Sequence, residues 1–558
     1  MNHLKRFIPI LFIALLFSAC SESPDYSSVL ETITEESLMT HIQALSADSM
    51  MGRAPGTEGE RKTVDYLISE YRKYGIEPGM PGGSYIQEVP VIGQVTDRDA
   101  QLHIRKNGQN LHSFDYYTEM MAWPASQQEQ VDVRDAELVY VGYGIVAPEE
   151  NWDDYKGTDV SGKILVFKNN DPSTFPDRFA GEARLYYGRW GYKFEMAEKM
   201  GALGAIIVHT TPTAGYGWNV VSGSWGRERF ELGKNGQPGS TEFSAWLTEE
   251  GSTALFSEAG LDLHEMLEAA ESPDFSPVTL DGITASIQLK STYKDLTLMN
   301  VVGKIEGNDP ELKNDYIVFT AHHDHLGVGT PVDGDSIFNG ALDNSSGVSA
   351  VLNLARTYAS VKDDLRRSML FVMVGGEESG LLGSDYFTGN PPVSPSNMTA
   401  NINIDGLNIF GPTKDIIVIG KGRSSMDEIM QKEAAKDGRE VRPDQNPEQG
   451  SYYRSDHFSF AKVGVPALYP KAGVRYLNRP DNYYEEVVQP YLSVNYHTVH
   501  DEVDENWDLS GAVKDVRLIF RVGKRIANQD EMVTWTPGDE FEAIRLQSLR
   551  EAGRQTGE

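Results

Sequence analysis

Two kinds of hydrophobic pattern alternate along this chain of 558 residues and divide it into regions. From about 35 to 76 the apolar positions recur at helical spacing, as in ERKTVDYLISEYRKYG, where a glycine marks the stop. From about 95 to 290 the pattern changes to short apolar runs such as SGKILVFKN, broken by turn-forming residues, which predicts strands. From about 297 onwards predicted strands and helices alternate, which is typical of a sheet with helices packed on its faces.

The strands of the last region can be placed individually. The runs NDYIVFTA, RSMLFVMVG, ANINI and GVPALYP each end in polar residues, and SSGVSAVLNLARTYASV between the first two reads as a helix. In open α/β sheets, ligands bind outside the carboxyl ends of the strands. We therefore expect an α/β fold whose functional site lies at the ends of these strands.

Length and charge limit the possible functions. A chain of this length is too long for one core, because domains usually contain about 100 to 200 residues, so we expect two or three. The hydrophobic fraction of 40 % is that of a globular protein. A formal net charge of -32 argues against a nucleic-acid partner, because phosphate binding needs a basic surface.

The first 20 residues resemble an export signal. A basic start, MNHLKR, precedes the apolar run FIPILFIALLF, which is too short to span a bilayer as a mature helix. Cys20, the only cysteine, stands where a bacterial lipoprotein box would be cleaved and lipidated, although Phe17 replaces the usual leucine. We expect a chain exported and lipid-anchored to the bacterial cell envelope, on the periplasmic face or the cell surface; the alternative is an ordinary signal peptide. In either case any metal must be bound by His, Asp and Glu.

Imidazoles and carboxylates collect at the predicted strand ends. The candidates are His322 and Asp324 after the first strand, Asp343 before the helix, Glu377 and Glu378 after the second strand, Asp405 after the third, and His497 in a later loop. Taken singly, they could be helix caps, charges at a helix start or polar surface residues. Together they suit two divalent ions about 3.5 to 4 Å apart that share one carboxylate.

Spacing within the first motif, AHHDHLG, relates His322 to Asp324. Asp324 lies two residues beyond it on an extended chain, so both side chains point the same way and the carboxylate can accept the other ring N–H of His322. Spacing alone leaves a pairing of His323 with His325 open.

These motifs resemble those of metallopeptidase family 28, the co-catalytic zinc aminopeptidases and carboxypeptidases. The segments HHD, DNSSG, EESGLLGS, NID and HTVHD stand in the family's order, and the match covers about 35–95 and 297–525. The resemblance implies the zinc-exopeptidase fold, a mixed, mostly parallel sheet with helices on both faces. The middle region, through KILVF and MGALGAIIV, resembles a β-rich protease-associated domain inserted into the peptidase domain.

Carried over residue by residue, the resemblance implies two zinc ions per chain. His322 and Asp405 would bind one zinc, Glu378 and His497 the other, Asp343 would bridge them, Asp324 would assist His322, and Glu377 would move protons. It also points to Tyr496 as an oxyanion donor, to Arg454 as a substrate contact, and to a cis peptide bond between Asp343 and Asn344. The long aromatic loop RYLNRPDNYYEEVVQPYLSVNY, residues 475–496, departs from the family's pattern, and we expect it to cap the cleft and restrict substrate size.

The sequence thus predicts a secreted, lipid-anchored zinc exopeptidase, most simply an aminopeptidase, that acts on peptides and touches the membrane only through its lipid. The expected regions are 1–20 signal peptide, 21–34 tether, 35–95 and 293–530 peptidase domain, 96–292 inserted domain, and 531–558 C-terminal tail. The alternatives are a carboxypeptidase or dipeptidase of the same family, a one-zinc glutaminyl cyclase, and a non-catalytic binding protein on the same scaffold.

Overall fold

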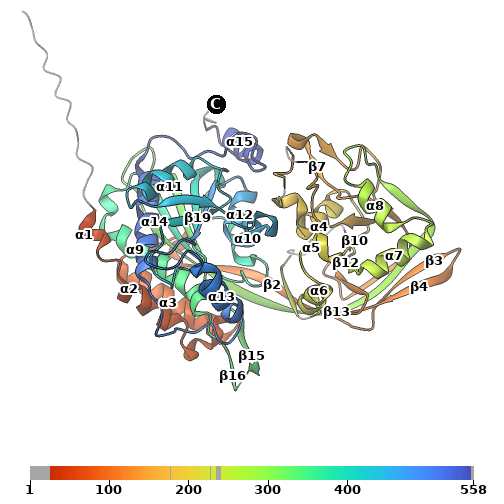
Figure 1. The fold of residues 1–558 in the computed structure, drawn as a ribbon, viewed down its shortest axis with the longest axis horizontal. Coiled ribbons are helices and arrows are strands. Elements are labelled where there is room, and N and C mark those ends of the chain that lie inside the picture. The colour runs from red at the N-terminus through yellow and green to blue at the C-terminus, as the bar shows by residue number, and fades with distance from the viewer. Residues whose placement is uncertain are drawn as a thin grey trace, which may run out of the picture.

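The protein has two large hydrophobic cores. In the computed structural model the two parts of the chain that form them lie side by side (Figure 1). The structure describes residues 26–175, 178–181, 183–226, 228–233, 241–332 and 334–554. The first core takes its buried residues from 33–76 and from 301–533, and the second from 100–289. The chain therefore enters the first core, builds the second as an insertion, and returns to the first.

The sheet of the first core is mixed. Its strands, in spatial order, are β2 (Ile86–Thr96), β13 (Val278–Ile305), β17 (Ser368–Val374), β14 (Tyr316–His322), β18 (Met398–Asn403), β21 (Ala467–Ala472), β19 (Asp415–Ile419) and β20 (Glu440–Pro443). The four central strands from β17 to β21 are parallel, whereas β13 and β19 run antiparallel to their neighbours β17 and β21. The strands β17 and β18 are buried throughout, as expected of parallel strands covered on both faces.

Helices cover both faces of this sheet. One face carries α2 (Glu35–Leu45), α3 (Glu58–Tyr74), α9 (Gly347–Ser360), α11 (Met426–Ala435) and α14 (Ser510–Asn528), and the other carries α10 (Leu382–Gly389) and α12 (His457–Lys462). Phe387 of α10 and Phe460 of α12 pack on Val318 of β14 from the second face. The expected α/β fold, a mixed and mostly parallel central sheet with helices on both faces, is confirmed.

The inserted domain has its own sheet. Its strands are β3 (Gln101–Lys106), β4 (Gln109–Asp115), β5 (Met120–Pro124), β6 (Gln130–Tyr140), β9 (Ile164–Lys168), β10 (Gly204–Val208) and β12 (Phe243–Leu247). Its main helices are α4 (Trp190–Lys199), α6 (Trp218–Trp225), α7 (Glu249–Glu258) and α8 (Leu263–Ala269). The 28-residue strand β13 pairs with β3 and β6 in its first part and with β2 and β17 in its second, so one continuous strand joins the two sheets.

Aromatic contacts also join the two parts. The ring of Tyr186, in the inserted domain, lies 5.0 Å from that of Phe458 and 6.3 Å from that of Tyr453 in the first core. The backbone N–H of Arg184 donates to the carbonyl of Pro447 at 3.3 Å. The inserted domain therefore packs against the peptidase domain beside helix α12.

Both chain ends depart from the expected tether and tail. Residues 26–34 contain α1 (Ser27–Leu30) and pack on the domain: the Tyr26 ring lies 6.2 Å from that of Phe520, and Ile33 is fully buried. The segment after 530 buries Trp535 and Phe541 before α15 (Glu542–Glu551). Both segments fold back because their apolar side chains gain free energy by leaving water.

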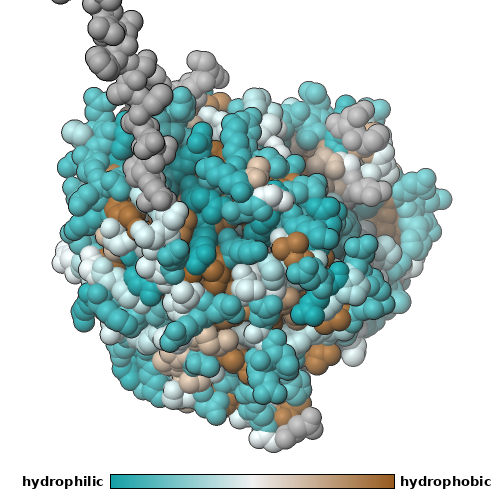
Figure 2. All heavy atoms as spheres, turned by 60° about the vertical axis from the view of Figure 1, so that its left-hand side comes forward, coloured by the Kyte–Doolittle hydropathy of each residue, from teal (hydrophilic) through white to brown (hydrophobic). Residues whose placement is uncertain are grey.

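The expected signal peptide, with Cys20, lies outside the described residues. Among the helices of the described ranges, none combines the length and apolar character needed to cross a membrane. The face shown in Figure 2 is mostly hydrophilic, with small separate hydrophobic patches, in keeping with the large net charge.

Candidate metal centre

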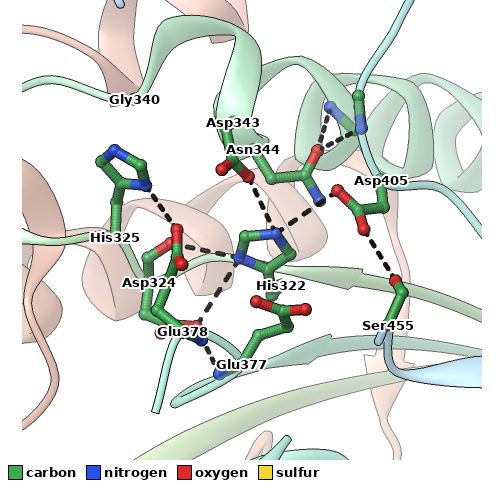
Figure 3. Close-up of polar contacts among 12 residues, drawn as sticks. His322, Asp324, His325, Gly340, Asp343, Asn344, Glu377, Glu378, Asp405 and Ser455 are labelled. Carbon is green, nitrogen blue, oxygen red and sulfur yellow. Dashed lines mark hydrogen bonds and ion pairs between the residues drawn. The ribbon is translucent and has the colours of Figure 1, made fainter. Parts of the chain in front are cut away.

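Three parallel strands and one helix deliver the candidate residues other than His497 to one edge of the sheet (Figure 3). His322 is the last residue of β14, Glu377 and Glu378 follow β17 after two glycines, and Asp405 follows β18. Asp343 lies in the turn immediately before α9. Because the strands are parallel, their carboxyl ends share one edge, which is where ligands bind in open α/β sheets.

Asp343 lies between two imidazoles. Its Oδ1 is 3.1 Å from Nε2 of His322, which is also 3.6 Å from Oδ1 of Asp405. Its Oδ2 is 3.0 Å from Nε2 of His497, which is also 3.0 Å from Oε2 of Glu378. The structure thus brings together all five residues expected as ligands, in two groups that share Asp343.

The donor set fits two divalent cations. Imidazole nitrogens and carboxylate oxygens without cysteine suit zinc sites that keep an open position. Nε2 of His497 is buried, and among the described residues it makes no hydrogen bond, although two carboxylates lie 3.0 Å away. Ligand atoms of His322, Asp343 and Glu378 lie within 4.8 Å of one another, as do those of His322, Glu377 and Asp405. So many carboxylates in one protein interior require compensating positive charge.

The imidazoles provide that positive charge when they are protonated. Burial opposes protonation of His497, but the carboxylates of Asp343 and Glu378, each 3.0 Å from its Nε2, outweigh burial and raise the pKa of His497 to about 10. Burial likewise opposes protonation of His322, yet the charge of Glu377 and the contacts with Asp343 and Asp405 raise its pKa well above the usual value. A cation that enters must therefore displace protons from both rings.

Neighbouring groups hold the bridging aspartate in place. Asp501 accepts hydrogen bonds from the backbone N–H groups of Leu342 at 2.9 Å and Asp343 at 3.0 Å. Oδ1 of Asn344 accepts the N–H groups of Gly347 and Gly406, both at 2.9 Å. The peptide bond between Asp343 and Asn344 is cis, as the resemblance implied.

Asp405 is held by three side chains that the sequence did not single out. Oδ2 accepts hydrogen bonds from Ser455 Oγ at 2.7 Å and Tyr469 OH at 2.9 Å, and the carbonyl oxygen accepts one from Lys471 Nζ at 2.6 Å. These contacts leave Oδ1 free to face His322. Burial opposes ionisation, but Lys471 and then His322 lower the pKa of Asp405. Only Ser455 carried a signal, since it adjoins Arg454 in the RSDHF motif.

Asp324 differs from its expected role. The ring Nδ1 of His322 lies 3.2 Å from the backbone oxygen of Asp324 and 3.8 Å from its carboxylate. That carboxylate instead accepts the backbone N–H groups of Glu377 at 3.1 Å and Glu378 at 3.3 Å. The strand ends at His322, so the extended alternation on which the expectation depended does not continue to Asp324. Asp324 therefore positions the glutamate turn.

The other two histidines of the motif are separated. Nε2 of His323 lies 2.8 Å from the carbonyl oxygen of Met299, on the far side of the strand. Nδ1 of His325 lies 2.7 Å from Oε1 of Glu378, and its ring is 5.8 Å from that of His497. A pairing of His323 with His325 is thereby excluded. His325, which the sequence set aside as lying past the strand end, contacts an expected ligand.

A cleft of about 590 Å³ opens on the centre. Tyr496 and Arg454, the two expected substrate contacts, both line it, and the Tyr496 ring stacks on that of His497 at 3.9 Å between centroids. Apolar and aromatic residues also line the cleft: Ile417 and Ile419 of β19, Tyr476, Tyr484, Val488 and Leu492 of the aromatic loop, and Phe410 and Val474. The loop thus closes one side of the cleft.

Parts of the chain are similar to known peptidases. Residues 300–520 match the model of peptidase family M28. The aminopeptidase YwaD of Bacillus subtilis is 34 % identical over 104 residues, which are 18 % of this chain and 20 % of that protein. A probable zinc metalloprotease of Pyrenophora teres is 32 % identical over 111 residues, which are 20 % of this chain and 23 % of that protein. The chain spans 20–27 % of the length of the curated relatives it matches.

Solved structures similar to this chain include two aminopeptidases. The aminopeptidase from Aneurinibacillus sp. strain AM-1 has 20 % sequence identity and a TM-score of 0.49, with 90 % of this chain and 96 % of that chain covered. The zinc aminopeptidase BSAP from Bacillus subtilis has 18 % identity and a TM-score of 0.41, with 90 % and 97 % covered.

Proposed function

Because this chain belongs to peptidase family M28 through its residues 300–520, we propose that it is a two-zinc exopeptidase that releases N-terminal residues from peptides. The observation that carries the proposal is the position of Asp343, whose two carboxylate oxygens each face a different imidazole at 3.0–3.1 Å. A shared carboxylate with one imidazole on each side is the arrangement that a pair of neighbouring catalytic metal ions needs.

The ligands divide into two sets around Asp343. His322 and Asp405 would hold one zinc, and His497 and Glu378 the other. When bound, the two ions would polarise the scissile carbonyl and lower the pKa of a water molecule towards about 7. Asp501 and Asp324 would act as positioning residues, because they hold the backbone of the bridging aspartate and of the glutamate turn.

Glu377 is the group available to move protons. Its carboxylate lines the cleft, and within the described part of the chain it accepts no hydrogen bond. Burial raises the pKa of Glu377 well above its ordinary value. A raised pKa suits a general base, because the carboxylate must gain a proton and then give it up. Glu377 would take a proton from the attacking water and pass it to the leaving amine.

Tyr496 would stabilise the negative charge that develops on the carbonyl oxygen. Although Tyr496 is 58 % exposed, partial desolvation of its hydroxyl in the cleft, and then the charge of Asp343, raise the pKa of Tyr496, so the hydroxyl keeps its proton at neutral pH and can donate a hydrogen bond. Its ring is fixed against His497 beside the expected zinc ligands.

The cleft favours a hydrophobic N-terminal residue. Phe410, Ile417 and Ile419 from one side and Val488 and Leu492 from the aromatic loop line it. Apolar walls with a few convergent polar groups are typical of small-ligand sites. The acidic residues at the metal end would bind the free α-amine. Export and lipidation at Cys20 remain part of the proposal and rest on the sequence of the first 20 residues.

Metal counting and turnover together test this function. We expect two zinc ions per chain by elemental analysis and release of leucine from leucyl peptides, both lost on dialysis against a chelator and restored by zinc. The Glu377→Gln variant should keep two zinc ions and lose turnover. One zinc per fully active chain, or turnover that survives complete removal of metal, would contradict the proposal.

A further inference from the structure

Three arginines lie where the inserted domain meets the rim of the cleft. Arg184 and Arg189 come from the segment before α4 of the inserted domain, and Arg454 lies before α12 of the peptidase domain. Tyr186, which lies between the first two in the sequence, packs on Phe458 at 5.0 Å between ring centroids. The contact between the two domains therefore brings Arg184 to a cavity that shares Ser451 with the cleft, which Arg454 lines, and Arg189 follows in the same segment at the start of α4.

Arg184 reaches the rim directly. Its backbone N–H donates to the carbonyl of Pro447 at 3.3 Å, and its side chain lies so close to Gly450 that an added Cβ there would be 3.3 Å from Arg184 Cδ. Arg184 and Ser451 line a cavity of about 460 Å³ between the domains, and Ser451 also lines the catalytic cleft, together with Arg454. The two cavities share this wall.

Few groups pair directly with these arginines, although five acidic residues, Glu149, Glu150, Asp444, Asp539 and Glu540, line the cavity beside Arg184. In the ranges that the structure describes, the side chains of Arg189 and Arg454 form no hydrogen bond or ion pair, and Nε of Arg184 is buried without a partner. The outer nitrogens of Arg184 donate to backbone carbonyls, of Thr213 at 3.0 Å and of Ala214 at 3.5 Å. The three guanidinium groups therefore have N–H donors that no described residue accepts.

The charges of these arginines oppose one another. Burial, and then the positive charge of Arg454, lower the pKa of Arg189 to about 10. Burial also lowers the pKa of Arg184. The negative charge of Asp171 acts against this shift, and the positive charge of Arg454 adds to it. The Asp171 carboxylate accepts a hydrogen bond from the backbone N–H of Leu185 at 2.8 Å. An anion bound here would relieve the repulsion, and the planar guanidinium matches a carboxylate best.

We propose that Arg184, Arg189 and Arg454 bind the free C-terminal carboxylate of a short peptide substrate. Arg454 lines the cleft together with Glu377 and Asp405, and it precedes Ser455, whose Oγ is 2.7 Å from Oδ2 of Asp405, so the arginine group adjoins the cleft of the metal centre. The inference rests on the proposed function: with its N-terminus at the metal centre, a peptide of two or three residues would place its carboxylate at the arginines. A cleft of about 590 Å³ is of the size that suits such a ligand.

The test compares four tripeptide substrates with the zinc-loaded full chain, measuring released leucine. They are Leu-Gly-Gly, its C-terminal amide, Leu-Gly-Glu amide and Leu-Gly-Gln amide. We expect kcat/KM for Leu-Gly-Gly to exceed that for its amide by roughly tenfold to a hundredfold, since charge-assisted hydrogen bonds are lost with the carboxylate. The Arg189→Gln variant should bring this ratio close to one, mainly through a higher KM for the free acid.

Two controls separate recognition from folding. Arg134→Gln removes an arginine of the inserted domain whose side chain is 70 % exposed and pairs with Asp132 at 2.6 Å, and it should keep the wild-type ratio. Thermal melting checks each variant, and should Arg189→Gln not fold, Arg454→Gln at the exposed rim replaces it. The comparison of wild-type substrates needs no variant.

The outcomes are distinct. A wild-type ratio near one for the free acid and its amide would overturn the proposal. A preference for Leu-Gly-Glu amide over Leu-Gly-Gln amide, with no effect of the terminal carboxylate, would also overturn it and assign the arginines to an acidic side chain. If the wild-type chain hydrolysed none of the four peptides, the failure would be that of the proposed function.

Discussion

Replacing Asp501 by asparagine tests whether the bridging aspartate is held in advance by its surroundings. The buried carboxylate of Asp501 accepts the backbone N–H groups of Leu342 at 2.9 Å and Asp343 at 3.0 Å. Asparagine keeps one acceptor oxygen and turns an NH₂ group towards the second donor. A hydrogen bond to a charged group contributes roughly 1.5–3 kcal/mol, and an unmet buried donor costs roughly 1–3 kcal/mol.

The expected effect of Asp501→Asn is therefore a loss of about 2–4 kcal/mol in the free energy of unfolding. Zinc affinity should fall about 10- to 100-fold, the usual effect of removing a group that orients a metal ligand. Urea denaturation measures the first quantity, and competition with a chelating dye measures the second. Asp504→Asn is the matched control, because Asp504 is exposed on the same loop. If zinc affinity stayed within about twofold of wild type in a folded variant, the positioning role would be refuted.

Four further outcomes follow from the structure. Glu377→Gln should lower kcat by about 10²- to 10⁴-fold with two zinc ions still bound, measured by leucine release and elemental analysis. Tyr496→Phe should lower kcat by about 10²-fold with little change in KM, because it removes one oxyanion donor. In the metal-free protein the pKa of His497 is raised to about 10, so the protonated ring stabilises the folded state. This stabilisation is complete below the unfolded pKa near 6.5 and is lost as the pH rises towards 10. Urea titrations across this pH range should show the decline in stability, and His497→Ala should make the decline smaller. Trp535→Ala should cost about 3–5 kcal/mol of unfolding free energy, since this buried residue anchors the C-terminal segment, whereas an unchanged melting curve would show that the segment is dispensable.

The sequence predicted most of the candidate metal centre because four of the five ligand candidates follow a strand or precede a helix that can be read from hydrophobic pattern, whereas His497 lies in a loop that this pattern does not place. Parallel strands must present their carboxyl ends at one edge, so the hydrophobic pattern was enough to predict His322, Glu378 and Asp405 as neighbours. The partners of Asp405 could not be predicted in this way, since Tyr469 and Lys471 belong to a later strand whose side-chain directions depend on sheet register.

Local geometry explains the error at Asp324. Side chains two residues apart point the same way only within a strand, and β14 ends at His322. The carboxylate of Asp324 therefore faces the backbone N–H of Glu377. The expected tether and tail were wrong for residues 26–34 and 531–554 for another reason. Ile33 and Trp535 stand among polar residues without a periodic pattern, so only tertiary packing reveals that they are buried. The arginine group could not be read from the sequence at all, because Arg184 and Arg454 are brought together only by the docking of two domains.

Anomalous X-ray diffraction at the zinc absorption edge, on crystals of the zinc-loaded protein, shows whether Asp343 bridges two ions. We expect two peaks about 3.5–4 Å apart, one beside each carboxylate oxygen of Asp343, with His322 next to the first and His497 next to the second. A single peak, or two peaks of which neither contacts Asp343, would contradict the proposed bridging role of Asp343.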